Sequence, residues 1–196
     1  MNATHLGRRG FLLSIGALAC QPLAAFANTA LPSDSLYQLP ASLTDQDGRT
    51  FDLASLRGTP LLVSMFYTSC EMVCPMIFET IQYTVKALAP AEQKALRVLM
   101  VSFDPTRDTV PVLKQAARAH GCDERWTLAR CDDTTVRKIA AALGFQYRRL
   151  ASGEFNHSTL IELLDVDGRV VAKSGKLGKE DATLVRATRQ ALSGHV

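Results

Sequence analysis

The sequence has little that points to a membrane or to nucleic acid. Its apolar segment FLLSIGALACQPLAAFA (residues 11–27) is short and contains Pro22, whereas a membrane-spanning helix needs about 20 apolar residues. No basic stretch with interleaved aromatic residues occurs, and 22 Lys and Arg against 19 Asp and Glu give a net charge of only +3. A nucleic acid is therefore not an expected partner. The 196 residues, of which 47% are hydrophobic and 21% charged, fit one globular domain.

The first 27 residues have the pattern of an export leader. Arg8 and Arg9 precede the apolar run, and Ala25-Phe26-Ala27 is typical of a small-x-small cleavage site. The order Arg-Arg-x-Phe-Leu is similar to a twin-arginine signal. We therefore expect residues 1–27 to be a signal peptide and the mature protein to be periplasmic. An uncleaved membrane anchor and a lipid on Cys20 are the less favoured alternatives.

The remaining chain is expected to contain a linker and one domain. Residues 28–40 are polar, contain two prolines and predict a flexible linker. Within residues 41–196, two apolar runs at 61–67 and 96–103 predict strands buried on both faces. Shorter strands are expected on either side of a turn at 45–49 and over 126–128, 145–150, 159–166 and 169–172. Helices are expected over 75–88, 108–119, 132–143 and 180–192.

This order of elements indicates an α/β fold. Strand–helix–strand–helix units, followed by a hairpin around Asp167-Gly168 and a last helix, are typical of a thioredoxin-like mixed central sheet flanked by helices.

Two cysteines four residues apart, Cys70 and Cys74, follow the first buried strand directly. Pro75 favours the first position of a helix, so we expect the helix to begin there with Cys74 near its N-cap. The positive end of a helix dipole stabilises a thiolate, which attacks disulfides and binds soft metals. The pair is thus a redox couple or part of a metal site, with a structural disulfide as the alternative.

A histidine is expected to face these cysteines. In a thioredoxin-like fold the facing loop carries a cis-proline, but this sequence has no proline after Pro111. The corresponding loop, residues 151–158, offers His157 instead. Two thiolates and one imidazole suit copper, and Cu(I) accepts three ligands. Zinc would need a water as fourth ligand, and an ordinary solvated loop histidine is the other alternative.

Three segments together resemble the SCO/SenC family of copper chaperones: FYTSCEMVCP (residues 66–75), VSFDPTRDT (101–109) and NHSTLIELLDVDG (156–168). The resemblance implies a thioredoxin-like fold with an extra N-terminal hairpin. It also implies that Cys70, Cys74 and His157 bind copper, as Cu(I) or Cu(II).

The family resemblance further implies a role in copper-site assembly. Its members deliver copper to the CuA centre of a respiratory oxidase, or mature that centre. The expected partners are a CuA-containing oxidase subunit or another cuproprotein and a periplasmic copper donor, close to a membrane. Alternatively, Cys70 and Cys74 form the catalytic redox pair of a thiol–disulfide oxidoreductase that keeps the cysteines of a copper-site partner reduced.

Two further features leave alternatives open. Cys122 and Cys131 either form an extra disulfide or are two free thiols. Asp104, Arg107 and Asp108 follow the second buried strand, at the sheet edge where α/β proteins bind ligands. One interpretation is that they contact a docking partner or hold the metal ligands from outside. The favoured interpretation is that they form a turn in which Asp108 caps the next helix.

Overall fold

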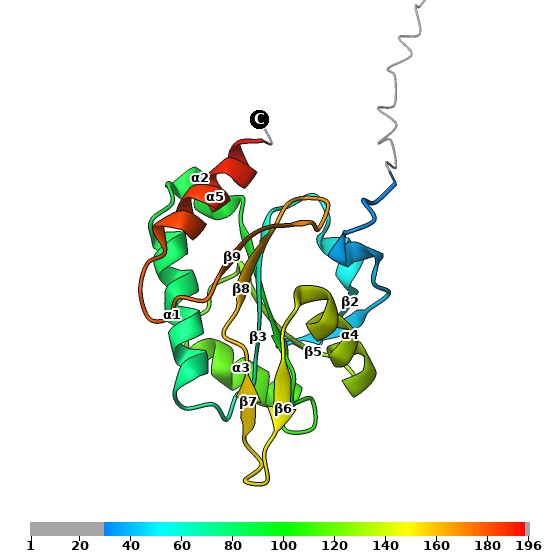
Figure 1. Cartoon of the computed structure of the whole chain (residues 1–196). Coiled ribbons are helices and arrows are strands. Elements are labelled where there is room, and N and C mark those ends of the chain that lie inside the picture. Colours follow the sequence, from blue (N-terminus) through cyan, green and yellow to red (C-terminus); the bar gives the residue numbers. More distant parts are fainter. Residues whose placement is uncertain (1–29, 195–196) are drawn as a thin grey trace, which may run out of the picture. The chain divides into compact units, whose positions relative to one another are not determined.

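A seven-stranded mixed sheet forms the centre of the domain in the computed structural model, which describes residues 30–194 (Figure 1). Its strands are β1 (Ser42–Asp45), β2 (Thr50–Asp52), β3 (Leu61–Phe66), β4 (Arg97–Ser102), β5 (Trp126–Arg130), β8 (Ile161–Leu164) and β9 (Val170–Ser174). Their order across the sheet is β2-β1-β5-β4-β3-β8-β9. The three central strands β5, β4 and β3 are parallel, and antiparallel pairs flank them on both sides. The predicted thioredoxin-like sheet with an extra N-terminal hairpin, β1–β2, is confirmed.

Helices cover both faces of this sheet. The connections β3–β4 and β4–β5 are crossovers of the same hand, which places α1 (Val73–Lys86) and α3 (Val110–Ala119) on one face. The last helix, α5 (Ala182–Ser193), packs beside α1, whereas α4 (Asp133–Leu143) covers the other face (Figure 1). The short helices are η1 (Leu36–Gln38), η2 (Leu53–Leu56) and α2 (Pro90–Lys94). Every residue of β3 is buried, as its nearly continuous apolar run predicts.

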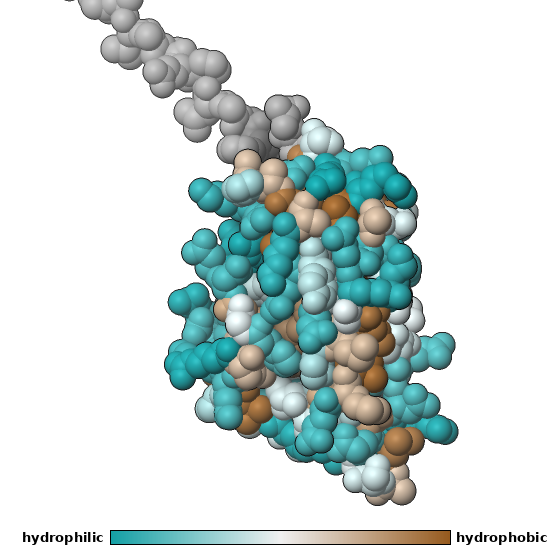
Figure 2. Space-filling view, turned by 90° about the vertical axis from the view of Figure 1, so that its left-hand side faces the viewer, coloured by the Kyte–Doolittle hydropathy of each residue, from teal (hydrophilic) through white to brown (hydrophobic). Residues whose placement is uncertain are grey.

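The outer surface of the α1 and α5 layer is mostly hydrophilic, with hydrophobic side chains in a few small groups (Figure 2). This is the surface expected of amphipathic helices whose apolar faces point to the core. Among the described helices, none is both long and apolar enough to cross a membrane.

Residues 31–40 belong to the domain, so the prediction of a flexible linker is wrong for this segment. Leu36 and Tyr37 are 5% and 3% exposed and join the core. The backbone N–H of Leu36 donates to the Gly168 carbonyl at 2.9 Å, which ties η1 to the β8–β9 turn. Two apolar side chains of this polar segment are buried in the core, and the sequence has no periodic pattern that predicts their burial. The predicted leader, residues 1–27, lies outside the described residues.

Cys122 and Cys131 are free thiols, so the alternative of a disulfide between them is wrong. They lie beyond opposite ends of β5, a strand that spans roughly 17 Å, whereas a disulfide requires Cα atoms within about 7 Å. Burial raises the pKa of each thiol to about 12. Both are therefore protonated and unreactive at neutral pH.

Candidate metal centre

The cysteine loop (residues 67–74) leads from β3 into the first turn of α1. The helix begins at Val73, two residues before the predicted start at Pro75, so Cys74 lies inside the first turn rather than at the N-cap. The actual N-cap residue, Met72, provides no capping hydrogen bond from its side chain. Instead, the Cys70 sulfur accepts the backbone N–H of Cys74 at 3.3 Å. Cys70 thus fills the acceptor role that a Ser or Asp side chain usually has at a helix start.

The two thiols differ strongly in acidity. A hydrogen bond from the Cys74 thiol, together with backbone N–H groups of Cys74 and Val73, lowers the pKa of Cys70 to about 4 against the opposing effect of burial. Cys74 is only 2% exposed. Its pKa is raised because its thiol donates a hydrogen bond to Cys70 and because burial removes it from water. The reduced pair therefore holds one thiolate, on Cys70, and one thiol, on Cys74.

This asymmetry predicts the alkylation of the reduced protein. With a pKa of about 4, Cys70 is expected to react with iodoacetamide at a nearly constant rate from about pH 5.5 to 8, and more slowly only below that range. Mass spectrometry of quenched samples measures the modified fraction at each cysteine. Cys122, whose pKa is raised to about 12, is the internal control and should react slowly throughout. A Cys70 rate that climbs through about pH 8.5, as for an ordinary thiol, would contradict the assignment.

His157 approaches the cysteines from a separate two-stranded hairpin. This hairpin pairs β6 (Tyr147–Arg149) with β7 (Phe155–His157), and Tyr147 lies opposite His157. The sequence predicted β6 but treated residues 151–158 as a loop, so β7 was missed. The missed signal is the turn around Gly153, which has a φ of +88°, a conformation that glycine adopts readily.

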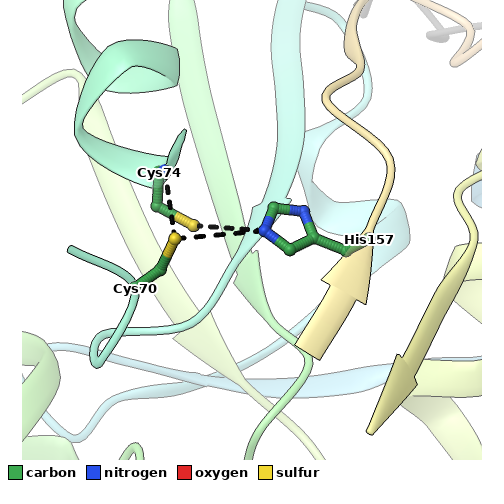
Figure 3. Close-up of side chains that lie close together, drawn as sticks. All are labelled: Cys70, Cys74 and His157. Atoms are coloured by element: carbon green, nitrogen blue, oxygen red, sulfur yellow. Dashed lines mark hydrogen bonds between the residues drawn. The ribbon is translucent and has the colours of Figure 1, made fainter. Parts of the chain in front are cut away.

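The histidine ring presents a free nitrogen to the sulfurs. Its Nδ1 lies 2.7 Å from the Ser158 carbonyl oxygen. A carbonyl can only accept, so Nδ1 carries the proton and Nε2 has the lone pair. Nε2 points at Cys70 and Cys74 (Figure 3). Such an outer hydrogen bond orients a metal-binding histidine and fixes its tautomer.

The three donor atoms have nearly the spacing that a bound ion needs. Nε2 lies 4.0 Å from the Cys70 sulfur and 4.0 Å from the Cys74 sulfur, and all three atoms lie within 4.8 Å of one another. In a planar three-coordinate site with zinc-like bonds of about 2.3 Å to sulfur and about 2.0 Å to nitrogen, each sulfur lies roughly 3.7 Å from the nitrogen. Small movements would bring all three into bonding range, so the structure brings together each predicted site residue.

The site combines an aromatic wall with an open cleft. The His157 ring packs against Tyr67, Phe103 and Phe145, with centroid distances of 5.7, 5.2 and 5.9 Å. These contacts restrict the ring on one side. A cleft of about 530 Å³ opens at the site and is lined by Tyr67, Cys70, His157 and further residues of the cysteine loop and the hairpin. A partner molecule can therefore reach Cys70 and His157, whereas Cys74 is buried beneath them.

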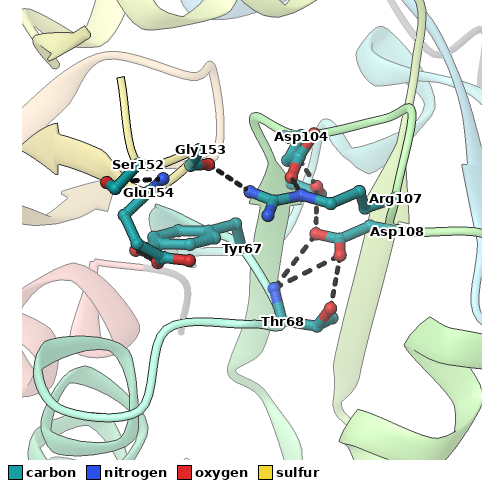
Figure 4. Close-up of polar contacts among 9 residues, drawn as sticks. Tyr67, Thr68, Asp104, Arg107, Asp108, Ser152, Gly153 and Glu154 are labelled. Carbon is teal, nitrogen blue, oxygen red and sulfur yellow. Dashed lines mark hydrogen bonds and ion pairs between the residues drawn. The ribbon is translucent and has the colours of Figure 1, made fainter. Parts of the chain in front are cut away.

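Asp108 supports the cysteine loop, and the prediction that it caps α3 is wrong. The N-cap of α3 is Thr109. Asp108 is fully buried, and its carboxylate accepts the Thr68 N–H at 3.1 Å, the Thr68 hydroxyl, and the Ser102 hydroxyl at 2.5 Å (Figure 4). Desolvation raises the pKa of Asp108. The carboxylate thus ties the start of the cysteine loop to the end of β4, which supports the other alternative for this segment.

Comparison with known proteins agrees with this geometry. A SCO2-like protein of Rickettsia prowazekii is 26% identical over 136 residues, which are 66% of this chain and 65% of the relative. The SCO1 protein homolog of Bacillus subtilis is 33% identical over 78 residues, 40% of each chain. The chain thus spans less than two thirds of the length of these curated relatives.

Solved structures and a family model extend the likeness over most of the chain. Bradyrhizobium japonicum ScoI with copper bound matches with a TM-score of 0.66 and 26% identity, over 81% of this chain and 98% of that one. The model of the SCO1/SenC family matches residues 30–193. From this match, together with the thioredoxin-like fold, the chain belongs to the SCO1/SenC family.

Proposed function

We propose that this chain binds one copper ion through Cys70, Cys74 and His157 and delivers it to a copper protein, such as the CuA-containing subunit of a respiratory oxidase. The observation that supports this most is the placement of two sulfurs and one imidazole nitrogen within 4.8 Å of one another. Sulfur is a soft ligand and imidazole an intermediate one, a set that suits copper. Two thiolates and a neutral imidazole leave one net negative charge with Cu(I) and none with Cu(II).

The protonation state of the reduced cysteine pair makes copper binding depend on pH. Cys70 is already a thiolate, whereas the pKa of Cys74 is raised by its hydrogen bond to Cys70 and by burial. Copper must therefore displace the Cys74 proton. Binding is expected to release about one proton at neutral pH and to weaken as the pH falls.

The proposed setting is the periplasm. The leader pattern of residues 1–27, with its two arginines and small-x-small site, supports export. In that compartment a copper donor would load the chain, and the recipient would lie at or near the membrane.

The asymmetric thiols favour a second candidate function, that of a thiol–disulfide oxidoreductase. The Cys70 thiolate would attack a disulfide of a copper-site partner and form a mixed disulfide. Cys74 would then attack Cys70, which leaves a Cys70–Cys74 disulfide and a reduced partner. The partial exposure of Cys70 beside the buried Cys74 fits this order of attack.

One pair of assays separates the two functions. In the first, the copper-loaded chain is mixed with a reduced, metal-free CuA domain, and the absorption of the assembled centre is followed. In the second, the reduced, metal-free chain is mixed with the same domain in its disulfide form. Delivery predicts copper transfer in the first assay. Copper that stays on the chain, with rapid reduction of the recipient in the second assay, would overturn delivery in favour of reduction.

A further inference from the structure

One short segment contacts both of the loops that carry the donor atoms. This segment, the β4–α3 loop (residues 103–109), places Arg107 and Asp108 side by side in the chain. Asp108 binds Thr68 at the start of the cysteine loop. Arg107 reaches the opposite way, and its Nη2 donates to the Gly153 carbonyl at 3.0 Å, in the turn of the β6–β7 hairpin (Figure 4).

The Arg107 side chain is fixed along its length. Its Nε is paired with the carboxylate of Asp104, whose side chain is only 5% exposed. Its guanidinium lies 5.9 Å from the centre of the Tyr67 ring and 5.7 Å from the centre of the Phe155 ring. Tyr67 belongs to the cysteine loop and Phe155 to the hairpin. Arginine has a planar cation that stacks on aromatic rings and donates hydrogen bonds in fixed directions, and lysine does not.

The hairpin itself has little internal support. It is a separate two-stranded sheet with three residues in each strand, and isolated two-stranded hairpins are marginally stable. Its turn is held from outside by Arg107 and by a hydrogen bond of 2.8 Å from the Tyr67 hydroxyl to Glu154. His157 ends β7, the short strand that follows this turn, and lies four residues after Gly153, so a shift of the turn moves the imidazole.

We infer that Arg107 is a positioning residue that holds the β6–β7 hairpin against the cysteine loop and thereby keeps His157 within reach of the two sulfurs. Arg107 touches neither sulfur nor imidazole in the contacts described, so it acts through the hairpin. The inference rests on the proposed function in one respect, namely that His157 is a copper ligand.

A double-mutant cycle tests this inference. Cu(I) affinity is measured by competition with a chromophoric chelator for the wild type, Arg107→Met, His157→Ala and the double variant. Arg107→Met keeps an unbranched apolar side chain and removes the guanidinium. We expect Arg107→Met to weaken binding by about 10- to 100-fold, as for outer-sphere partners of metal ligands. The same substitution should have no further effect once His157 is absent.

The cycle has clear opposing outcomes. Equal losses in both backgrounds, or no loss in either, would overturn the inference. Arg149→Met is the matched control because Arg149 also lies over the Phe155 ring, at 6.0 Å, and it should leave affinity unchanged. If Arg107→Met does not fold, Arg107→Lys takes its place, since it keeps the charge and loses the planar fork.

A metal-free readout keeps this inference separate from the copper proposal. Hydrogen exchange of the hairpin amides is measured in the reduced, metal-free wild type and in Arg107→Met. Faster exchange confined to residues 147–157, with β3 and β8 unchanged, is expected. Unchanged exchange in the hairpin would overturn the positioning role even if copper binds. Failure of copper to bind at all would instead overturn the proposed function and leave the hairpin result standing.

Discussion

The Cys74→Ser variant is expected to lose at least about 100-fold in Cu(I) affinity while it keeps the fold. A structural metal site of four ligands is worth about 10–16 kcal/mol, so one ligand contributes roughly 3 kcal/mol, or a factor of about 100 or more. A serine hydroxyl is a hard ligand that stays protonated, and it cannot replace a thiolate for a soft ion. Cys74 is 2% exposed in a site shaped for a small side chain, which the serine hydroxyl also fills.

The matched control for this variant is Cys131→Ser. Cys131 is also buried, at 9% exposure, but it lies after β5 and outside the group of donor atoms. Its replacement should leave the affinity unchanged. Chelator competition on both variants, with circular dichroism to verify folding, makes the comparison. Affinity close to the wild type in Cys74→Ser would remove this sulfur from the site.

The Asp108→Ala variant is expected to lower the free energy of unfolding by about 3 kcal/mol and to weaken copper binding as well. The substitution leaves three donors without their acceptor: the N–H and hydroxyl of Thr68 and the hydroxyl of Ser102. A buried donor left unsatisfied costs about 1–3 kcal/mol. Thr68 lies two residues before Cys70, so the loss of its hydrogen bonds to Asp108 also loosens the position of the Cys70 thiolate. Denaturant unfolding and chelator competition measure the two effects.

An exposed aspartate provides the control for Asp108. Asp132 caps α4 by accepting the backbone N–H groups of Thr134 and Thr135, and Asp132→Ala should cost about 1 kcal/mol. Its copper affinity should not change, because α4 lies on the other face of the sheet. If both alanine variants lose stability and neither loses affinity, Asp108 has no role in holding the cysteine loop.

Asp108 also predicts a pH dependence of stability. Burial raises the pKa of Asp108 in the folded protein, whereas an unfolded aspartate titrates near pH 3.9. The part of its contribution that depends on protonation is therefore fully present below about pH 3.9 and is lost as the pH rises through the folded pKa, whereas the hydrogen bonds to Thr68 and Ser102 are a separate contribution. Asp108→Asn, which does not titrate, should lack this component. Unfolding curves of the two proteins from about pH 3 to 8 measure the difference, and parallel curves would contradict it.

The parts of the fold that sequence patterns predicted are those fixed by local chemistry. Nearly continuous apolar runs predict β3 and β4 because strands buried on both faces are mostly apolar. Asp132 and Gly144 delimit α4 because one accepts the first N–H groups and the other adopts a left-handed φ of +68°. The three donor residues were also predicted, since their types and order suit a soft metal.

The features that were missed depend on contacts between distant segments. Asp108 precedes a helix, and its local position favours a cap. Its actual role is set by Thr68, 40 residues earlier in the chain. The packing of Tyr37 depends likewise on the β8–β9 turn, and that of β7 on Arg107 and Tyr67. None of these pairings has a periodic signature, because each is a single contact made by tertiary folding.

X-ray absorption at the copper edge of the reduced, copper-loaded chain tests the proposed site most directly. The expected spectrum has two sulfur neighbours near 2.3 Å and one nitrogen near 2.0 Å, distances of about the size found in thiolate–imidazole sites. In His157→Ala the nitrogen should disappear and the two sulfurs remain. An unchanged nitrogen shell in that variant, or fewer than two sulfurs in the wild type, would contradict a copper site built from Cys70, Cys74 and His157.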